Sequence, residues 1–263
     1  IYPSDIEKFE VLKNASETAQ YGSRGAAGVI LVTTKKGRDG KFQISYDGNW
    51  GWERFYRNLE MLSAHEYVQT AQQLGRTYID GGHNVDYTAL PTRAGGVQNH
   101  HVAFSGGTAE SNYRASVAYT GRETVIHHIG YNNFVAKLDL TQMAFDNHLT
   151  IDFGIFGSSQ NSRNISDPQA LFYAAASQNP TLSPAWNGSG WTVNPTANQI
   201  AAPQARLRVK DEVFNQNLNS HLSLKVRLLP ELSFKLFGSY TFTSTENAQF
   251  SPTWTAAQAM AAR

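Results

Sequence analysis

The sequence predicts a mainly β protein: part of an antiparallel transmembrane β-barrel, preceded by a short α/β segment. Two observations support this fold class. Apolar and polar residues alternate with a period of two along about seven segments, and several of these are near the ~9–11 residues with which a tilted strand crosses a bilayer. Short turns and long excursions also alternate between the segments, as they do in outer-membrane barrels.

In residues 15–37, three glycines at intervals of three precede an apolar run. A loop that binds phosphate needs a strand before it and a helix after it, because the anion sits on the helix N-terminus. Here the order is reversed, since Ala15–Gln20 is rich in helix formers and Val29–Thr34 is β-branched. The glycines therefore predict a tight helix-to-strand turn, and nucleotide binding is disfavoured.

The first long strand begins at Lys41, where even positions are apolar or glycine and odd positions are polar as far as Trp52. One face of this strand is therefore apolar and the other is polar. A soluble β-sandwich shows the same alternation, although with shorter strands, so that alternative stays open. The alternation recurs in four further segments, 112–120, 149–158, 221–228 and 232–242, and more weakly at 102–104 and 134–140.

The connections between these strands are of two lengths. Short turns are expected near residues 105–110, 144–148 and 229–231, and long loops at about 54–98 and 160–213. Short turns on one side of the sheet and long loops on the other favour an outer-membrane barrel, with the long loops on the extracellular side. Aromatic residues near strand ends are candidates for interfacial girdles: Trp50, Trp52, Tyr119, Tyr131 and Tyr240.

Composition limits the possible functions. The 22 basic and 21 acidic residues balance, which gives no electrostatic reason to expect nucleic acid as a partner. Charged residues make up only 16%, below the roughly 25% of ordinary soluble domains. The absence of cysteine excludes disulfides, thiolate zinc sites and thiol nucleophiles. The chain opens without an initiator Met, and we expect it to be a fragment of a mature protein.

Catalytic and metal-binding patterns are weak, so we predict neither an enzyme nor a metal or cofactor site. The pair His65–Glu66 resembles a zinc-protease helix, but Gln69 replaces the second histidine. The pairs His100–His101 and His127–His128 place neighbouring rings on opposite strand faces, which prevents easy chelation of one ion. Two carboxylates on predicted polar faces are assigned a lumen-lining role: Asp139 and Asp152.

The run "DIEKFEVLKNASETAQYGSRGAAGVILVTTKKG", residues 5–37, resembles the end of the plug domain of SusC/RagA-type TonB-dependent outer-membrane transporters. Downstream, "ISYDGNWGW" resembles the first barrel strand of that family, and "HVAFSGGTAESNYRASVAYTGRETVI" resembles its second hairpin. The resemblance spans nearly the whole chain. It departs mildly from the family's plug run at Phe9, Asn14, Glu17, Gln20 and Ala27.

The resemblance implies two parts: residues 1–37 as the C-terminal part of a plug domain, and residues 38–263 as the N-terminal part of the barrel. It implies that about seven strands belong to a barrel of 22, and that the remaining strands and most of the plug lie elsewhere. It further implies a plug strand at Phe9–Leu12, a short helix at Ala15–Tyr21 and a second strand at Val29–Thr34. The plug motif comprises Tyr21, Gly22, Ser23, Arg24, Gly25 and Gly28.

By the same resemblance, the chain is part of a nutrient importer in the bacterial outer membrane. The implied substrate is an oligosaccharide or a peptide, and the implied partners are the lipid bilayer, a SusD-like surface lipoprotein and the TonB complex, which is contacted through N-terminal segments missing from this sequence. The alternative is a soluble or surface-attached β-rich carbohydrate-binding protein. Loop aromatics are the candidate substrate contacts, because sugar faces stack on such rings: Tyr173, Trp186 and Trp191.

Overall fold

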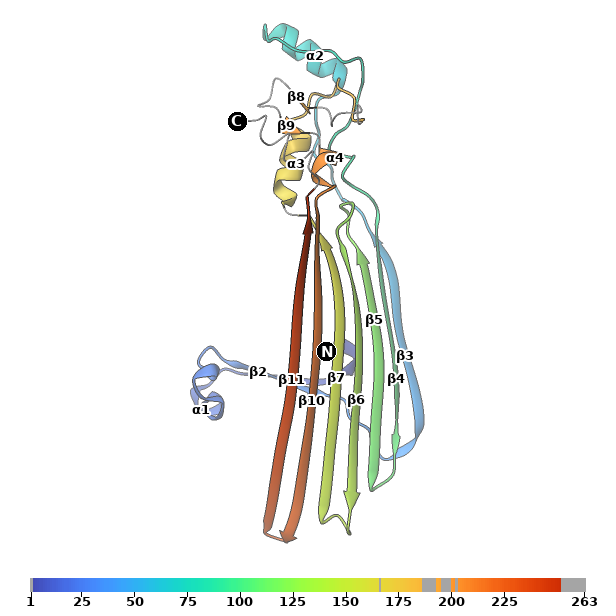
Figure 1. Cartoon of the computed structure of the whole chain (residues 1–263), viewed down its shortest axis with the longest axis vertical. Helices are drawn as coiled ribbons and strands as arrows, with labels where there is room; N and C mark the ends of the chain where they lie inside the picture. The colour runs from blue at the N-terminus through green and yellow to red at the C-terminus, as the bar shows by residue number, and fades with distance from the viewer. Residues whose placement is uncertain (1, 166, 186–192, 195–199, 202, 252–263) are drawn as a thin grey trace.

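The computed structural model describes residues 2–165, 167–185, 193–194, 200–201 and 203–251. A long seven-stranded sheet forms the body of the molecule, a two-stranded hairpin crosses one face of it, and short helices gather at one end (Figure 1). Within these residues no helix has the length and apolar character needed to cross a membrane.

The large sheet is an antiparallel meander in which each strand pairs with its neighbour along the chain, in the order β11-β10-β7-β6-β5-β4-β3. This architecture confirms the predicted fold class. The strands are β3 (Gly40–Glu53), β4 (Gly95–Gly107), β5 (Ser111–Glu123), β6 (Gly130–Ala144), β7 (Leu149–Asn164), β10 (Lys210–Leu229) and β11 (Leu232–Phe250).

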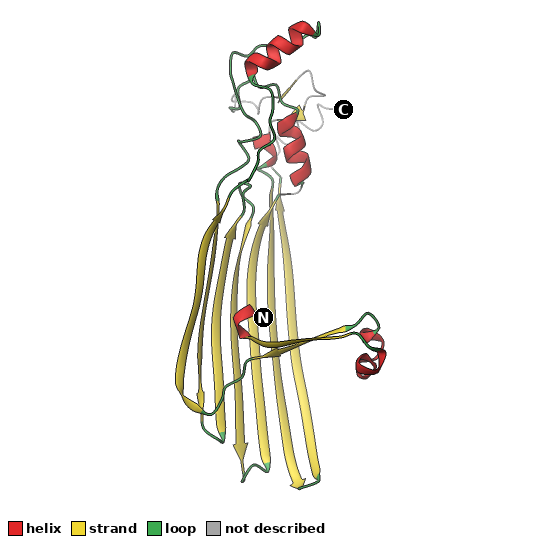
Figure 2. Ribbon diagram, turned by 180° about the vertical axis from the view of Figure 1, so that it is seen from behind, coloured by secondary structure: helices red, strands yellow, loops and turns green. Residues whose placement is uncertain are grey.

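The two ends of the sheet differ in their connections (Figures 1 and 2). The end with the connections 108–110, 145–148 and 230–231 is the turn end. The opposite end carries the short connection 124–129 and both long connections, and is the loop end. The long connections at the loop end are 54–94 and 165–209, shorter than predicted because β4 begins at Gly95 and β7 runs on to Asn164. Backbone pairing continues there past the last apolar side chain, so the apolar pattern underestimates strand length.

The side chains of β3 show the division of the sheet into two faces. Ile44, Tyr46 and Trp50 lie on the face turned away from the hairpin, and each is more than 60% exposed. We call this the outer face, and the face crossed by the hairpin the inner face. Four of the five predicted girdle aromatics lie on the outer face, but Tyr131 pairs with inner-face Arg122 and therefore lies on the inner face.

The hairpin consists of β1 (Ile6–Leu12) and β2 (Val29–Thr34). Between them lie a short helix, α1 (Ala15–Thr18), and a 3-10 segment, η2 (Ala19–Gly25). The hairpin crosses the inner face at mid-height, and its tip projects past the edge strand β11 (Figures 1 and 2). The glycines form a helix-to-strand turn: Gly22 has a φ of 62°, and a Cβ at Gly25 would lie 2.7 Å from the carbonyl oxygen of Thr18.

Three helices lie at the loop end: α2 (Ala64–Gln73), α3 (Pro168–Ala176) and α4 (Pro203–Arg206). Ser63 and Glu66 form a capping box at the start of α2, with the Ser63 amide donating to Glu66 Oε2 over 2.9 Å. The His65–Glu66 pair is thus part of a helix start. Ile165, Leu171 and Leu207 form a small buried core, against which Ile126 and Ile129 of the connection between β5 and β6 pack.

Candidate functional site

A buried polar cluster joins the start of the hairpin to the inner face. Asp5 ends a 3-10 turn, η1 (Pro3–Asp5), and is only 1% exposed. Its carboxylate accepts hydrogen bonds from Arg114 Nη2 at 3.0 Å and from Ser116 Oγ at 2.7 Å. Nε2 of His101, which is also 1% exposed, lies 3.2 Å from Asp5 Oδ1. We call these four residues the seam.

The strands position the seam through their alternation. Arg114 and Ser116 are two residues apart on β5 and therefore point to the same face. His101 lies on the adjacent strand β4, where Tyr2 stacks on its ring with centroids 4.8 Å apart and planes 5° apart. On the other side of the ring, Nδ1 lies 3.4 Å from Asp47 Oδ2. The His101 ring is therefore held between two carboxylates.

The protonation state of Asp5 follows from opposing effects. Burial by itself raises the pKa of this carboxyl group, because it disfavours the charged form. The hydrogen bonds from Ser116 and Arg114 and the charge of His101 act in the other direction, and the net result is a pKa below the ordinary value. Asp5 is therefore a carboxylate at neutral pH, and the seam is a buried ion pair.

Further polar contacts connect β2 and the residues after it to the same face. Lys137 Nζ donates to Thr34 Oγ1 at 2.9 Å and also contacts Asp139. Lys36 Nζ lies 3.7 Å from Asp152, which accepts a hydrogen bond from Thr141 at 2.8 Å. The two carboxylates singled out in the sequence, Asp139 and Asp152, thus lie on the inner face beside cations.

The prediction of opposite strand faces is confirmed for His100–His101, which lies on β4, but it was wrong for His127–His128, which lies in a turn and not on a strand. On the outer face, His100 Nδ1 lies 2.8 Å from the hydroxyl of Tyr46, whereas His101 is buried on the inner face. His127 and His128 lie between β5 and β6, with ring centroids 6.2 Å apart. No group of three potential metal ligands occurs among the residues that the structure describes.

The glycine-rich motif lies away from the seam, at the tip of the hairpin (Figure 1). Tyr21 and Arg24 are exposed there, whereas Gly25 is buried against Thr18. Of the other motif residues, Gly22 and Ser23 lie in η2, and Gly28 directly precedes β2. Their local effect is to close the hairpin.

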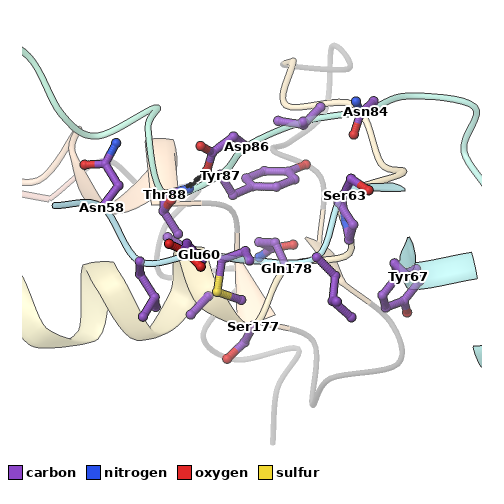
Figure 3. Close-up of a pocket in the computed structure, with 17 residues that line it drawn as sticks. Asn58, Glu60, Ser63, Tyr67, Asn84, Asp86, Tyr87, Thr88, Ser177 and Gln178 are labelled. Atoms are coloured by element: carbon purple, nitrogen blue, oxygen red, sulfur yellow. Dashed lines mark hydrogen bonds between the residues drawn. The ribbon is translucent and has the colours of Figure 1, made fainter. Parts of the chain in front are cut away.

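A pocket of about 760 Å³ opens at the loop end, between residues 58–63, 84–88 and 175–180 (Figure 3). Tyr87 forms part of its wall and donates a hydrogen bond to the Leu182 carbonyl at 3.1 Å. Burial raises the pKa of Tyr87 to about 12, so the phenol stays protonated. Its wall combines apolar side chains, such as Leu59, Met61 and Val85, with amide, hydroxyl and carboxylate groups, which suits a ligand with both apolar and polar surface.

The predicted substrate contacts are placed unequally with respect to this pocket. Tyr173 lies on α3 and is 68% exposed, but it is not among the residues that line the pocket. Trp186 and Trp191 lie outside the described residues. The seam, in contrast, was not predicted as a site. The available signal was the polar alternation of β5 that includes Arg114 and Ser116, but nothing local links Asp5 to it, since 109 residues separate Asp5 from Arg114.

Sequence comparison with curated proteins indicates one class of relatives. The chain is 29% identical to the TonB-dependent receptor SusC of Bacteroides thetaiotaomicron over 261 residues, which cover 88% of this chain and 26% of that protein. The chain is a relative of the SusC-type TonB-dependent receptors. It is also 27% identical to TonB-dependent receptor P3 of Formosa agariphila, over 95% of this chain and 26% of the relative. No protein-family model matches.

Solved structures agree with this SusC-type relationship at the level of the fold. A structure of the RagAB peptide importer in the 'closed-closed' state superposes with a TM-score of 0.77 and 17% sequence identity. The superposition covers 95% of this chain and 33% of that chain. The chain spans about a quarter of the length of the curated relatives it matches. Its strands therefore correspond to a section of a larger barrel.

Proposed function

We propose that this chain is the end of the plug and the first seven wall strands of an outer-membrane transporter that imports a nutrient. In this proposal residues 1–37 belong to the plug and residues 38–263 to the barrel. The import is driven through TonB, and the chain performs no covalent chemistry. A glycan or a peptide is the substrate, delivered with the help of a SusD-like surface lipoprotein.

The observation that carries the proposal is the opposite character of the two sheet faces. The outer face exposes large apolar side chains along whole strands, such as Phe42 and Ile44 on β3 and Phe234 on β11, each about 60% exposed. Water disfavours so large an apolar surface, but bilayer hydrocarbon does not. The inner face buries the charged seam under the hairpin, as the lumen of a plugged barrel would.

The free strand edges support a larger barrel as the setting. On their outer sides, β3 and β11 pair with no other strand in the described part of the chain. Within a bilayer, unpaired backbone groups of such edges cost several kcal/mol each. Further strands of the same protein satisfy both edges when the barrel closes.

A fractionation experiment on the full-length protein that contains this chain tests the proposal. We expect the protein in the outer-membrane fraction, soluble only with detergent, and nutrient uptake that is lost when TonB is deleted. Recovery in the aqueous fraction without detergent would contradict the proposal and favour the soluble carbohydrate-binding alternative. Co-purification of an encoded neighbouring lipoprotein tests the proposed partner.

A cross-link between the two parts tests the assignment of hairpin and wall. The 263 residues contain no cysteine, which allows specific labelling of this region of the protein. Cysteines replacing Thr34 and Lys137, whose side chains are in contact, are expected to react with a short reducible cross-linker. We expect uptake to stop on cross-linking and to return on reduction, whereas a Cys pair at Thr34 and outer-face Ala136 should not cross-link.

A further inference from the structure

One row of the inner face is uncharged across the whole sheet. Strand registers place one residue of each strand directly opposite the next, from the first edge strand to the last. All seven side chains in this row are amides or hydroxyls. The row consists of Asn49, Asn99, Thr120, Asn133, Gln160, Asn215 and Thr245.

The row lies next to the seam, one step nearer the loop end. Asn99 is two residues from His101 on the same strand, and Thr120 is four residues beyond Ser116. The hairpin contacts that the structure gives are on the turn side of the row, at His101, Arg114, Ser116 and Lys137. None of the seven row residues is buried. A solute that moves from the loop end toward the plug would therefore pass this row before it reaches the seam.

The row residues hydrogen-bond to one another only in part. Asn99 Nδ2 donates to Asn49 Oδ1 at 2.7 Å, and Thr245 Oγ1 donates to Asn215 Oδ1 at 2.8 Å. A side-chain amide has two N–H donors and an oxygen with two lone pairs, so one such bond leaves further groups for a solute. The row can thus exchange hydrogen bonds with a polar solute without first breaking its own.

The neighbouring rows differ because they carry charges. Toward the loop end, Arg122 pairs with Glu53 at 2.7 Å. Toward the turn end, Asp47 lies 3.4 Å from His101, and Lys137 contacts Asp139 beyond it. Arg122 thus already faces an opposite charge within the protein, and Asp47 already lies beside the imidazole ring of His101. A charged solute in the uncharged row would lose water, and the charged side chains of the two adjacent rows of the described sheet, Arg122 and Asp47, already have partners, so the desolvation of the solute is costly.

We propose that this row is a selectivity band that favours uncharged, hydroxyl-rich solutes over charged ones. Hydroxyl groups of a solute replace their hydrogen bonds to water with bonds to amides and hydroxyls of the wall, at little net cost. A sulfate, carboxylate or ammonium group loses the hydration of its charge, and the uncharged row offers no opposite charge to compensate for that loss. The inference rests on the proposed transport function and narrows the proposed substrates to uncharged glycans or peptides.

Binding to the full-length protein in detergent tests the selectivity band. The probes are malto-, cello- and laminarihexaose, the same hexaoses carrying one sulfate, and the cationic glucosamine hexamer, measured by equilibrium dialysis. The test variant is N133D/Q160E/N215D, which changes three row residues nearly isosterically. The matched control is Gln216→Glu, the same change one residue from Asn215 but on the outer face.

We expect at least one neutral hexaose to bind at least tenfold more tightly than its sulfated counterpart. In the triple variant we expect the ratio of neutral to cationic binding to fall at least tenfold, while the control keeps the wild-type ratio. A correctly folded variant with an unchanged ratio, or a wild type that binds sulfated and neutral hexaoses equally or binds no neutral hexaose, would overturn the inference. Outer-membrane location and TonB-dependent uptake are measured separately, so failure of the band is distinguishable from failure of the transport proposal.

Discussion

The two faces of the seven-stranded sheet are made by the same strands but are stabilised in opposite ways. On the outer face Ile44 is 61% exposed, whereas on the inner face His101, on the neighbouring strand, is 1% exposed. The exposed residue is apolar and the buried residue is polar. This is the reverse of the distribution in a soluble protein, where apolar side chains are buried and charged ones face water.

The comparison shows that each face is matched to its own surroundings. The outer face needs an apolar solvent, and nothing within the described chain covers it. The inner face is held by directed interactions with the hairpin, such as the ion pair of Arg114 with Asp5. Substitutions on the two faces should therefore fail for different reasons, and four experiments test the distinction.

The largest effect is expected at the seam, from Asp5→Ala in the full-length protein. Removing the carboxylate leaves Arg114 buried without its partner, which typically costs about 3–5 kcal/mol. The measurement is amide hydrogen exchange in β1 and β2, which reports the free energy of local opening. The control Asp39→Ala removes an exposed carboxylate and should leave that exchange unchanged. Equal protection in both variants would show that the ion pair does not hold the hairpin.

A slightly smaller effect is expected on the outer face, from Ile44→Arg. A lipid-facing Arg near the bilayer midplane costs about 2–4 kcal/mol, falling toward the interfaces. The neighbouring change Gln43→Arg places the same group on the inner face and should be tolerated. The measurement is the denaturant dependence of folding into lipid vesicles. Equal destabilisation at both positions would refute the assignment of the two faces.

A substitution in the turn of the hairpin should lower the free energy of local opening by a smaller amount. A Cβ introduced by Gly25→Ala would meet the backbone oxygen of Thr18 at 2.7 Å, and relief of such overpacking typically costs about 1–3 kcal/mol. Ala27→Ser, two residues on and exposed, should change the opening energy by less than about 0.5 kcal/mol. Exchange rates of the β1 and β2 amides measure both. Similar rates in the two variants would indicate that the turn adapts without strain.

The smallest effect is expected from changing the pH near neutrality, because Asp5 stays charged there and the ion pair of the seam is kept. Because the folded-state pKa of Asp5 is lowered, its contribution is fully present above the unfolded value of 3.8 and is lost as pH falls through the lower folded value. Protection of β1 should therefore be flat above about pH 5 and fall in acid. The variant Asp5→Asn should lack that fall. A wild-type profile that declines between pH 5 and 8 would point to another group.

Much of the sheet could be predicted from the sequence because strand alternation is local. The faces of Ile44 and Gln43 follow from adjacent positions alone, and the helix-to-strand order around Gly25 is readable within about 20 residues. The prediction was least accurate at strand ends, and it placed Tyr131 with the outer aromatics. Polar strand ends such as Ser158–Asn164 carry no apolar signal, although their backbones continue to pair.

The sequence by itself determined which side chains alternate, where the chain turns, and that no cysteine is present for thiol chemistry. Only the tertiary structure decided that Asp5 meets Arg114 across 109 positions, and that seven uncharged side chains align in one row. The physical reason is the separation along the chain over which each interaction acts. Alternation and turn chemistry act between near neighbours, whereas the ion pair and the row depend on strand register and on how the hairpin lies across the sheet.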